Sequence, residues 1–370
     1  MTDFSDEAFM AAALALGRRN LGRAAPNPAV GALLVKEGVV VARGFTGVGG
    51  RPHGEAQALA VAGEAARGAT LYVTLEPCSH HGETPPCAGA IVAAGVARVV
   101  SAMEDPDKRV AGRGHALLRA AGVEVVSGVL ERQARRAHLG HMRRVAEQRP
   151  MVTLKLAQTP DGFAAGAAHD PRLHVTGPLA DAFTHMQRAL HDAIMVGSGT
   201  VREDDPLMTV RLPGLEDEKR LRVALDSKLS LSPRSRFASL ARTSPTLVIA
   251  GRDVAEKAAA GFTEATGAEV VRVAQDMLGR VAPPAALAEL ARRGVTRVFC
   301  EGGPRLAESL ICGGFADEVL LHTGGKPLGG AGRPALRPAA RATLEDSELY
   351  RLIETARLGS DTMTRRERIA

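Results

Sequence analysis

The sequence is poor in aromatic residues. It contains no tryptophan, two tyrosines and nine phenylalanines among 370 residues. Single-stranded nucleic acid is usually held by stacking of its bases on aromatic side chains, and no block of consecutive lysines or arginines compensates for their scarcity. The formal net charge of +6 indicates an anionic partner. We therefore expect a small phosphorylated substrate and no nucleic acid.

Long hydrophobic runs are also missing. No apolar stretch approaches the ~20 residues that span a bilayer, and Met1 to Glu7 is acidic where a secretory signal would be basic. We expect a cytoplasmic protein with no membrane partner. Cysteines in such a reducing compartment do not usually form disulfides. Of the four cysteines, the close pair Cys78 and Cys87 therefore indicates a metal site.

The length indicates two domains, because 370 residues exceed one ordinary core. Predicted helices and strands alternate through both halves, which is typical of α/β layers. The stretch 131–149 is polar and basic and ends at Pro150. We place the boundary there, with domains at 1–148 and 149–370.

The hydrophobic pattern predicts the individual elements. In the first domain we expect helices at 5–19, 53–67, 86–94 and 113–121, and strands at 30–36, 39–43, 70–75, 98–102 and 123–126. In the second we expect strands at 152–156, 193–196, 222–225, 246–250, 270–273, 297–300 and 318–322, and helices at 178–190, 284–293 and 304–312. Glu37-Gly38 lies between two short apolar runs, which is a hairpin signal.

A candidate catalytic metal site is formed by His53, Cys78 and Cys87, with Glu55 two residues after the histidine. Two thiolates and one imidazole suit Zn²⁺ and leave a fourth position for water, whose pKa the metal lowers toward ~7. A site of this kind can replace an amine by water if a further group carries the water proton to the departing amine, and Glu55 suits this role. Singly, these residues could be a loop histidine, a solvated glutamate and core cysteines. Together they form the zinc-deaminase signature.

The spacing of the cysteines narrows the family. The usual signature ends in Pro-Cys-x-x-Cys, whereas here eight residues separate Cys78 from Cys87, in the sequence Pro-Cys-Ser-His-His-Gly-Glu-Thr-Pro-Pro-Cys. With the motifs at 26–31, 74–78 and 105–114, this resembles the bifunctional riboflavin-biosynthesis deaminase–reductases. The resemblance implies a cytidine-deaminase-like α/β/α domain with zinc, and it implies that Asn27, His80 and Asp105 contact the pyrimidine substrate.

The second half contains no Gly-x-Gly-x-x-Gly motif, so a Rossmann fingerprint is not supported. Instead, Glu301-Gly302-Gly303-Pro304 follows a predicted strand and opens a helix, whose free N–H groups could bind phosphate. Alone, this motif is an ordinary turn. However, motifs at 155–162, 200–211, 225–227 and 301–304 occur in the order of the family's C-terminal domain, which resembles dihydrofolate reductase in its α/β fold.

The resemblance implies NADPH as the second cofactor and assigns residues to both ligands. The cofactor residues would be Ala157, His174, Thr200, Asp204, Ser227 and Gly303. The substrate residues would be Arg172, Arg188, Met208, Arg211 and Glu301. Arginine forks at 188 and 211 suit a ribose phosphate, because a guanidinium binds phosphate bidentately.

Two residues depart from the family pattern in a way that bears on the substrate. Glu83 stands where the family usually has arginine or lysine, and Asp107 where it has asparagine. Both add negative charge near a phosphorylated substrate. The phosphate would then need another anchor, for which Lys108 and Arg109 are the candidates.

The expected function is two consecutive reactions of riboflavin biosynthesis. The first domain would hydrolyse an amine from diaminohydroxyphosphoribosylaminopyrimidine, and the second would reduce the ribosyl group to ribityl with NADPH; we expect a homo-oligomer. A nucleic-acid (tRNA) base deaminase with an appended binding domain is the alternative, and the long cysteine spacing counts against it. A non-catalytic zinc module is a further alternative, and Glu55 beside only three ligands counts against it.

Overall fold

The computed structural model describes residues 5–79, 85–107, 111–167, 170–171 and 173–369. His80, Glu83, Lys108, Arg109 and Arg172 lie outside the described residues. The chain divides into two compact units, Met1–Arg149 and Pro150–Ala370.

A five-stranded mixed sheet forms the centre of the N-terminal unit, in the order β2-β1-β3-β4-β5. The strands are β1 (Gly31–Lys36), β2 (Val39–Phe45), β3 (Thr70–Val73), β4 (Arg98–Ser101) and β5 (Glu124–Ser127). The first three pair antiparallel and the last three pair parallel. Glu37 and Gly38 have φ values of 51° and 76°, which suit a two-residue hairpin turn. The expected hairpin is confirmed.

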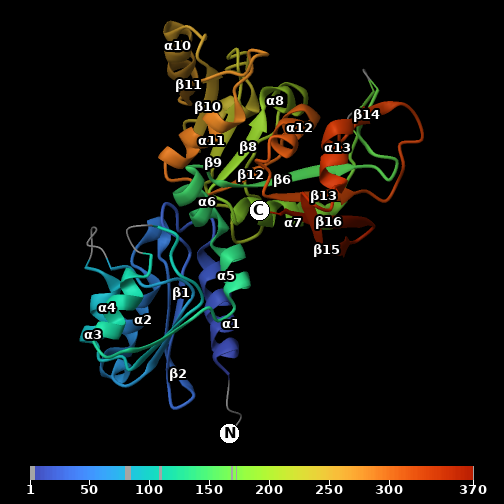
Figure 1. Cartoon of the computed structure of the whole chain (residues 1–370). Helices are drawn as coiled ribbons and strands as arrows, with labels where there is room; N and C mark the ends of the chain where they lie inside the picture. The colour runs from blue at the N-terminus through green and yellow to red at the C-terminus, as the bar shows by residue number, and fades with distance from the viewer. Residues whose placement is uncertain (1–4, 80–84, 108–110, 168–169, 172, 370) are drawn as a thin grey trace. The chain divides into compact units, whose positions relative to one another are not determined.

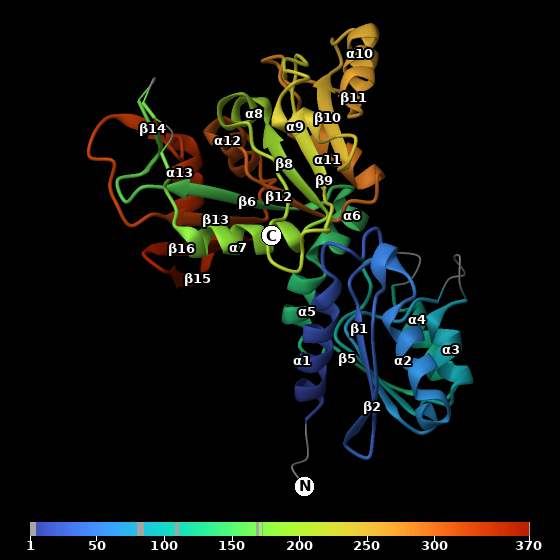
Figure 2. The same cartoon turned by 180° about the vertical axis from the view of Figure 1, so that it is seen from behind.

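Helices cover both faces of this sheet (Figures 1 and 2). On one side lie α1 (Asp6–Gly17) and α5 (Glu131–Ala137); on the other lie α2 (Gly54–Ala62), α3 (Cys87–Ala93) and α4 (Arg113–Ala120). Ser5 begins α1 by accepting a hydrogen bond from the Ala8 N–H, as N-cap serines do. Met10, Leu34 and Ile91 are fully buried between the layers. The expected α/β/α architecture is confirmed.

The polar stretch before the boundary is helical, which the sequence did not predict. It forms α5 and α6 (Leu139–Glu147). Its buried residues include Ala134, His138 and Gly140. The stretch contains few apolar residues, so its helices were overlooked, although α6 is amphipathic.

The C-terminal unit contains a nine-stranded sheet in the order β11-β10-β9-β8-β12-β6-β13-β16-β15. Its strands are β6 (Met151–Gln158), β8 (Ala193–Gly197), β9 (Leu221–Leu225), β10 (Thr246–Gly251), β11 (Glu269–Val273), β12 (Arg297–Cys300), β13 (Glu318–Thr323), β15 (Tyr350–Leu358) and β16 (Asp361–Arg368). The first seven in the order pair parallel, and β16 and β15 complete the sheet antiparallel. Parallel strands bring their carboxyl ends to one edge, where α/β proteins bind ligands.

Both faces of the nine-stranded sheet are buried along its central strands. In β8, Met195 packs in one core cluster and Ile194 in another, as expected for a parallel strand covered on both sides. The first cluster includes residues of α11 (Pro283–Arg292), α12 (Pro304–Cys312) and α13 (Pro338–Glu345). On the other face, α9 (Arg236–Ser239) and α10 (Glu256–Thr266) contribute Phe237 and Phe262, and α7 (Pro178–Ala189) contributes Phe183.

Several elements of this unit were not predicted. They include α8 (Ser198–Asp204), α9, α10, α13, the β15–β16 hairpin, and the short pair of β7 (Phe163–Gly166) and β14 (Gly332–Pro334). The hairpin carries many charged residues and β15 is mostly exposed, so it lacks an apolar run. Within the described residues, no helix has the length and apolarity needed to cross a bilayer.

Candidate functional site

A candidate metal site lies at one end of the five-stranded sheet, where His53, Cys78 and Cys87 come together. His53 immediately precedes α2, Cys78 follows β3, and Cys87 is the first residue of α3. The Nδ1 atom of His53 lies 3.7 Å from the Cys78 sulfur and 3.3 Å from the Cys87 sulfur. Zn–S and Zn–N bonds of about 2.3 and 2.1 Å would place ligand atoms about 3.5 Å apart around a tetrahedral ion. The three donor atoms therefore fit zinc.

The two sulfurs are electrostatically unequal. Hydrogen bonding from Cys87 and from His53 lowers the pKa of Cys78 to about 4, and the Cys87 N–H donates to the same sulfur at 3.3 Å. The hydrogen bond to Cys78, together with burial, raises the pKa of Cys87. One thiolate is therefore ready for metal binding, and the second proton would leave when the ion binds.

Glu55 lies in the first turn of α2 and is 4% exposed. Burial raises the pKa of Glu55 to about 7 although His53 opposes the shift. A carboxyl group with a pKa near neutrality suits proton transfer in both directions. Glu55 is thus placed beside the three donor atoms without being one of them.

Asn27 lies beside the metal ligands. Its amide nitrogen donates to the Gly50 carbonyl oxygen at 2.9 Å and lies 3.4 Å from Nε2 of His53. Gly50 has a φ of 91°, and a Cβ there would lie 2.8 Å from Cβ of Asn27. Only glycine suits this position, because other residues would be strained and would displace Asn27.

Asp105 is held by residues that the sequence did not identify as functional. Its carboxylate accepts hydrogen bonds from Nε2 of His141 at 3.1 Å and from the Asp107 N–H at 2.8 Å. Buried Glu76 accepts the Asp105 N–H at 3.2 Å and also two backbone N–H groups at the start of α4, those of Gly112 and His115. Glu76 lies in the quoted motif at 74–78, whereas His141 carries no sequence signal.

The C-terminal unit has a cavity of about 730 Å³ at the carboxyl ends of its central strands. Nine of the expected residues line it: Ala157, His174, Arg188, Thr200, Asp204, Met208, Arg211, Glu301 and Gly303. Ser227 lines a second cavity of about 1010 Å³. Both cavities are lined by Gly166, Thr200 and Gly303, among others. The two cavities therefore adjoin each other.

The guanidinium group of Arg188 is not free to bind a phosphate in this cavity. Its Nε and Nη2 atoms donate to the two carboxylate oxygens of Glu301 at 2.6 and 2.9 Å, and Nη1 donates to the Thr209 carbonyl oxygen at 2.9 Å. Burial raises the pKa of Glu301, but Arg188 outweighs burial and keeps it below its usual value. Arg211 has no carboxylate partner among the described residues, so it is the better placed of the two for phosphate.

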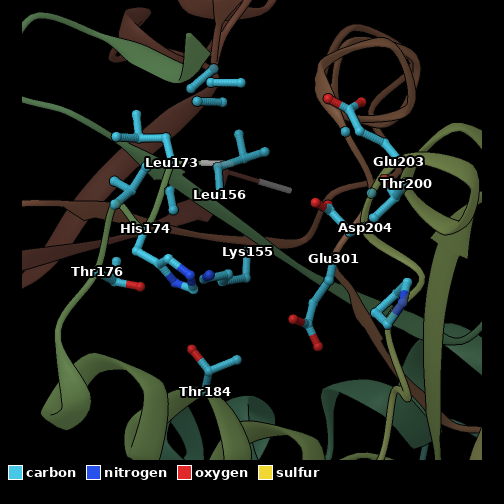
Figure 3. A pocket seen from close by; sticks show the side chains of 18 of the residues that line it. Lys155, Leu156, Leu173, His174, Thr176, Thr184, Thr200, Glu203, Asp204 and Glu301 are labelled. Carbon is cyan, nitrogen blue, oxygen red and sulfur yellow. The ribbon is translucent and has the colours of Figure 1, made fainter. Parts of the chain in front are cut away.

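The cavity also contains titratable residues that were not predicted as site residues. Lys155 lies in β6, and Figure 3 shows its side chain and that of His174 extending toward each other, with the carboxylates of Asp204 and Glu301 across the cavity. Burial lowers the pKa of Lys155. His185 accepts a hydrogen bond from the Arg211 N–H at 3.1 Å, and burial together with Arg188 lowers its pKa to about 4. The sequence did carry a signal for Lys155, because a lysine is unusual within an apolar strand such as the predicted one at 152–156.

Two family models match the chain. Residues 4–103 match the cytidine and deoxycytidylate deaminase zinc-binding region, and residues 150–362 match the RibD C-terminal domain. The riboflavin biosynthesis protein RibD of Escherichia coli is 34% identical over 374 residues, covering 96% of this chain and 97% of that protein. The protein of the same name from Bacillus amyloliquefaciens is 38% identical over 333 residues, covering 90% and 87%.

Solved structures extend the similarity to the fold. RibD of Acinetobacter baumannii superimposes with a TM-score of 0.83 at 30% identity, covering 98% of this chain and 99% of that one. A diaminohydroxyphosphoribosylaminopyrimidine deaminase/5-amino-6-(5-phosphoribosylamino)uracil reductase from Thermotoga maritima gives 0.82 at 30% identity, with coverage of 98% and 99%. The likeness therefore spans both units.

Proposed function

This chain belongs to the family of bifunctional riboflavin-biosynthesis deaminase–reductases, and from that membership we propose how its residues divide the two reactions. Zinc and NADPH are the cofactors of the two activities. We assign residues 1–148 to deamination of diaminohydroxyphosphoribosylaminopyrimidine and 149–370 to reduction of the resulting aminouracil. The observation that carries the assignment is the cluster of His53, Cys78 and Cys87 beside buried Glu55.

In the deaminase site the three donor atoms would hold zinc, which when bound makes a water molecule nucleophilic at neutral pH. Glu55 takes a proton from the attacking water and delivers it to the exocyclic nitrogen, which leaves as ammonia. Asn27 and Asp105 orient the pyrimidine, and their own partners fix both side chains. The net change is the replacement of an amine by an oxygen from water.

In the reductase site NADPH supplies the hydride that reduces the ribosyl carbon. Gly303 precedes α12, whose Pro304 lacks an N–H and whose next backbone N–H groups can donate hydrogen bonds to the cofactor diphosphate. Lys155, whose pKa is lowered by burial, is suited to hold or move a proton at the sugar. Arg211 binds the substrate phosphate, and Arg188 fixes the Glu301 carboxylate.

Conversion of the free nucleotide tests this function. We expect the pure protein to release ammonia from the pyrimidine nucleotide without NADPH, and to form the ribityl product only when NADPH is added. Ammonia release from RNA but not from the nucleotide would instead support the tRNA base deaminase. Bound zinc with a fourth protein ligand and no ammonia release would support the binding module. The cytoplasmic location and the homo-oligomer stay predictions.

A further inference from the structure

The larger of the two adjoining cavities has five arginines with different surroundings. Arg202, Arg280, Arg305, Arg333 and Arg337 all line the larger cavity. NADPH carries one phosphate more than NADH, on the 2′ oxygen of its adenosine ribose. An arginine that selects NADPH must keep its charge available for that group. This inference rests on the proposed reductase function.

Three of the five arginines are paired with carboxylates. Arg280 binds Asp276 at 2.8 Å, Arg333 binds Glu203, and Arg337 binds Glu308. Their charges are therefore largely compensated within the protein. Of these five, Arg202 and Arg305 have no carboxylate partner in the described part of the chain, so these two supply the uncompensated positive charge of the larger cavity.

The two unpaired arginines lie at different strand ends. Arg305 is the second residue of α12, directly after the glycine turn that follows β12. Arg202 lies in α8, which follows β8, and its Nη1 atom donates to the hydroxyls of Ser198 at 3.3 Å and Ser230 at 2.7 Å. Ser230 follows β9. Arg305 therefore suits the diphosphate at the start of α12, and Arg202 marks a separate corner between the ends of β8 and β9.

Hydroxyl groups complete this corner. Ser227 accepts the Val281 N–H at 2.8 Å, and both Ser198 and Ser227 line the cavity. Among the described residues, neither hydroxyl proton has an acceptor. Each can therefore donate to a phosphate oxygen, as can the remaining N–H groups of the Arg202 fork.

The Asp226 carboxylate does not oppose an anion here. Asp226 follows β9, a position where an acidic side chain can bind a ribose hydroxyl and reject a 2′-phosphate. Here it is only 1% exposed, and its oxygens accept the Ser230 hydroxyl at 3.0 Å and the Leu231 N–H at 2.8 Å. It fixes Ser230 and does not face the cavity.

The spacing of the strands agrees with the size of the cofactor. In the sheet, β12, β8 and β9 are consecutive parallel neighbours. Adjacent strands lie about 4.8 Å apart, so the ends of β12 and β9 are separated by roughly 10 Å. A diphosphate at the first and a monophosphate near the second fit within one dinucleotide.

We propose that Arg202, with the hydroxyls of Ser198 and Ser227, binds the 2′-phosphate of NADPH and makes the reductase select NADPH over NADH. Arg305 binds the diphosphate common to both nucleotides and contributes no selectivity. The corner is a specificity site separate from the reacting end of the cofactor.

Calorimetric titration of the full chain with NADPH and with NADH tests this assignment. Losing one charged contact should raise the Kd for NADPH roughly 10- to 100-fold in Arg202→Met, while the Kd for NADH changes less than about twofold. Arg305→Met is the matched control and should raise both Kd values by the same factor. Arg202→Lys should restore part of the preference, since it keeps the charge but not the fork.

The possible outcomes distinguish a failure of this proposal from a failure of the proposed reductase function. Equal weakening of both nucleotides in Arg202→Met, no weakening of either, or a selective loss in Arg305→Met would each overturn the role of Arg202. A wild-type protein that binds both nucleotides equally would also overturn it, while ribityl formation with either nucleotide would leave the reductase function standing. Unchanged NADH binding in Arg202→Met shows that the variant is folded.

Discussion

Removing the Arg188 side chain should destabilise the reductase unit more than removing an exposed arginine. Arg188→Met leaves the Glu301 carboxylate without its partner, and these side chains are only 9% and 13% exposed. Breaking a buried ion pair costs about 3–5 kcal/mol. Because both side chains keep some contact with solvent, we expect about 3 kcal/mol at pH 7.

The loss should depend on pH. In the wild type the pKa of Glu301 is lowered, so its contribution to stability is present above the unfolded pKa and falls away only at acidic pH below it. In the variant, burial without Arg188 raises this pKa above its ordinary value. Protonation then relieves the unpaired charge. The difference in stability should therefore shrink as the pH falls from 7 to 5.

Differential scanning calorimetry of the full chain measures this effect, and NADPH identifies the reductase transition by raising its Tm. A loss of about 3 kcal/mol corresponds to a drop of roughly 6–12 °C for a unit of this size. Arg341→Met, which removes an exposed pair with Glu345 within α13, is the exposed control and should cost at most about 1 kcal/mol. The double variant Arg188→Met/Glu301→Gln should recover part of the loss. If Arg188→Met lowers the Tm no more than Arg341→Met, the reasoning is refuted.

Four further predictions concern the deaminase unit. Cys87→Ser should lower zinc content, measured by atomic emission, from about one ion per chain to near zero; full retention would contradict the assigned ligand. Glu55→Gln should slow ammonia release by about 10²- to 10⁴-fold with zinc retained, and near-normal release would exclude its proton-transfer role. His141→Ala should raise the deaminase KM roughly 10-fold by freeing Asp105; an unchanged KM would show that the pair is only structural. Glu83→Lys should lower this KM by a similar factor if the residue lies near the substrate phosphate, and no change would mean that it does not.

The apolar strands and the cluster of candidate metal ligands could be predicted from sequence because their signals are local. Every residue of β10 is buried, so the strand is one continuous apolar run. His53, Cys78 and Cys87 are uncommon residue types at a diagnostic spacing. Such features need no knowledge of which elements meet in space.

The supporting contacts could not be predicted because they join distant parts of the chain. The Arg188–Glu301 pair spans 113 residues, and the His141–Asp105 pair spans 36. Nothing in the local sequence distinguishes these charged residues from solvated ones. From the sequence we therefore expected the Arg188 guanidinium group to bind a phosphate, whereas in the structure it binds the Glu301 carboxylate.

Helix α6 determines where this chain can be divided into separately produced parts. All three candidate zinc ligands precede residue 90, so a fragment ending near residue 130 would keep the candidate metal site. It would nevertheless lose His138, whose Nε2 atom lies 3.1 Å from the Thr74 carbonyl oxygen, and His141, which holds Asp105. A stand-alone deaminase fragment should therefore extend through Glu147. The shorter piece would bind zinc while leaving its substrate-binding loop without support, so metal content alone is a poor guide to whether an excised module is complete.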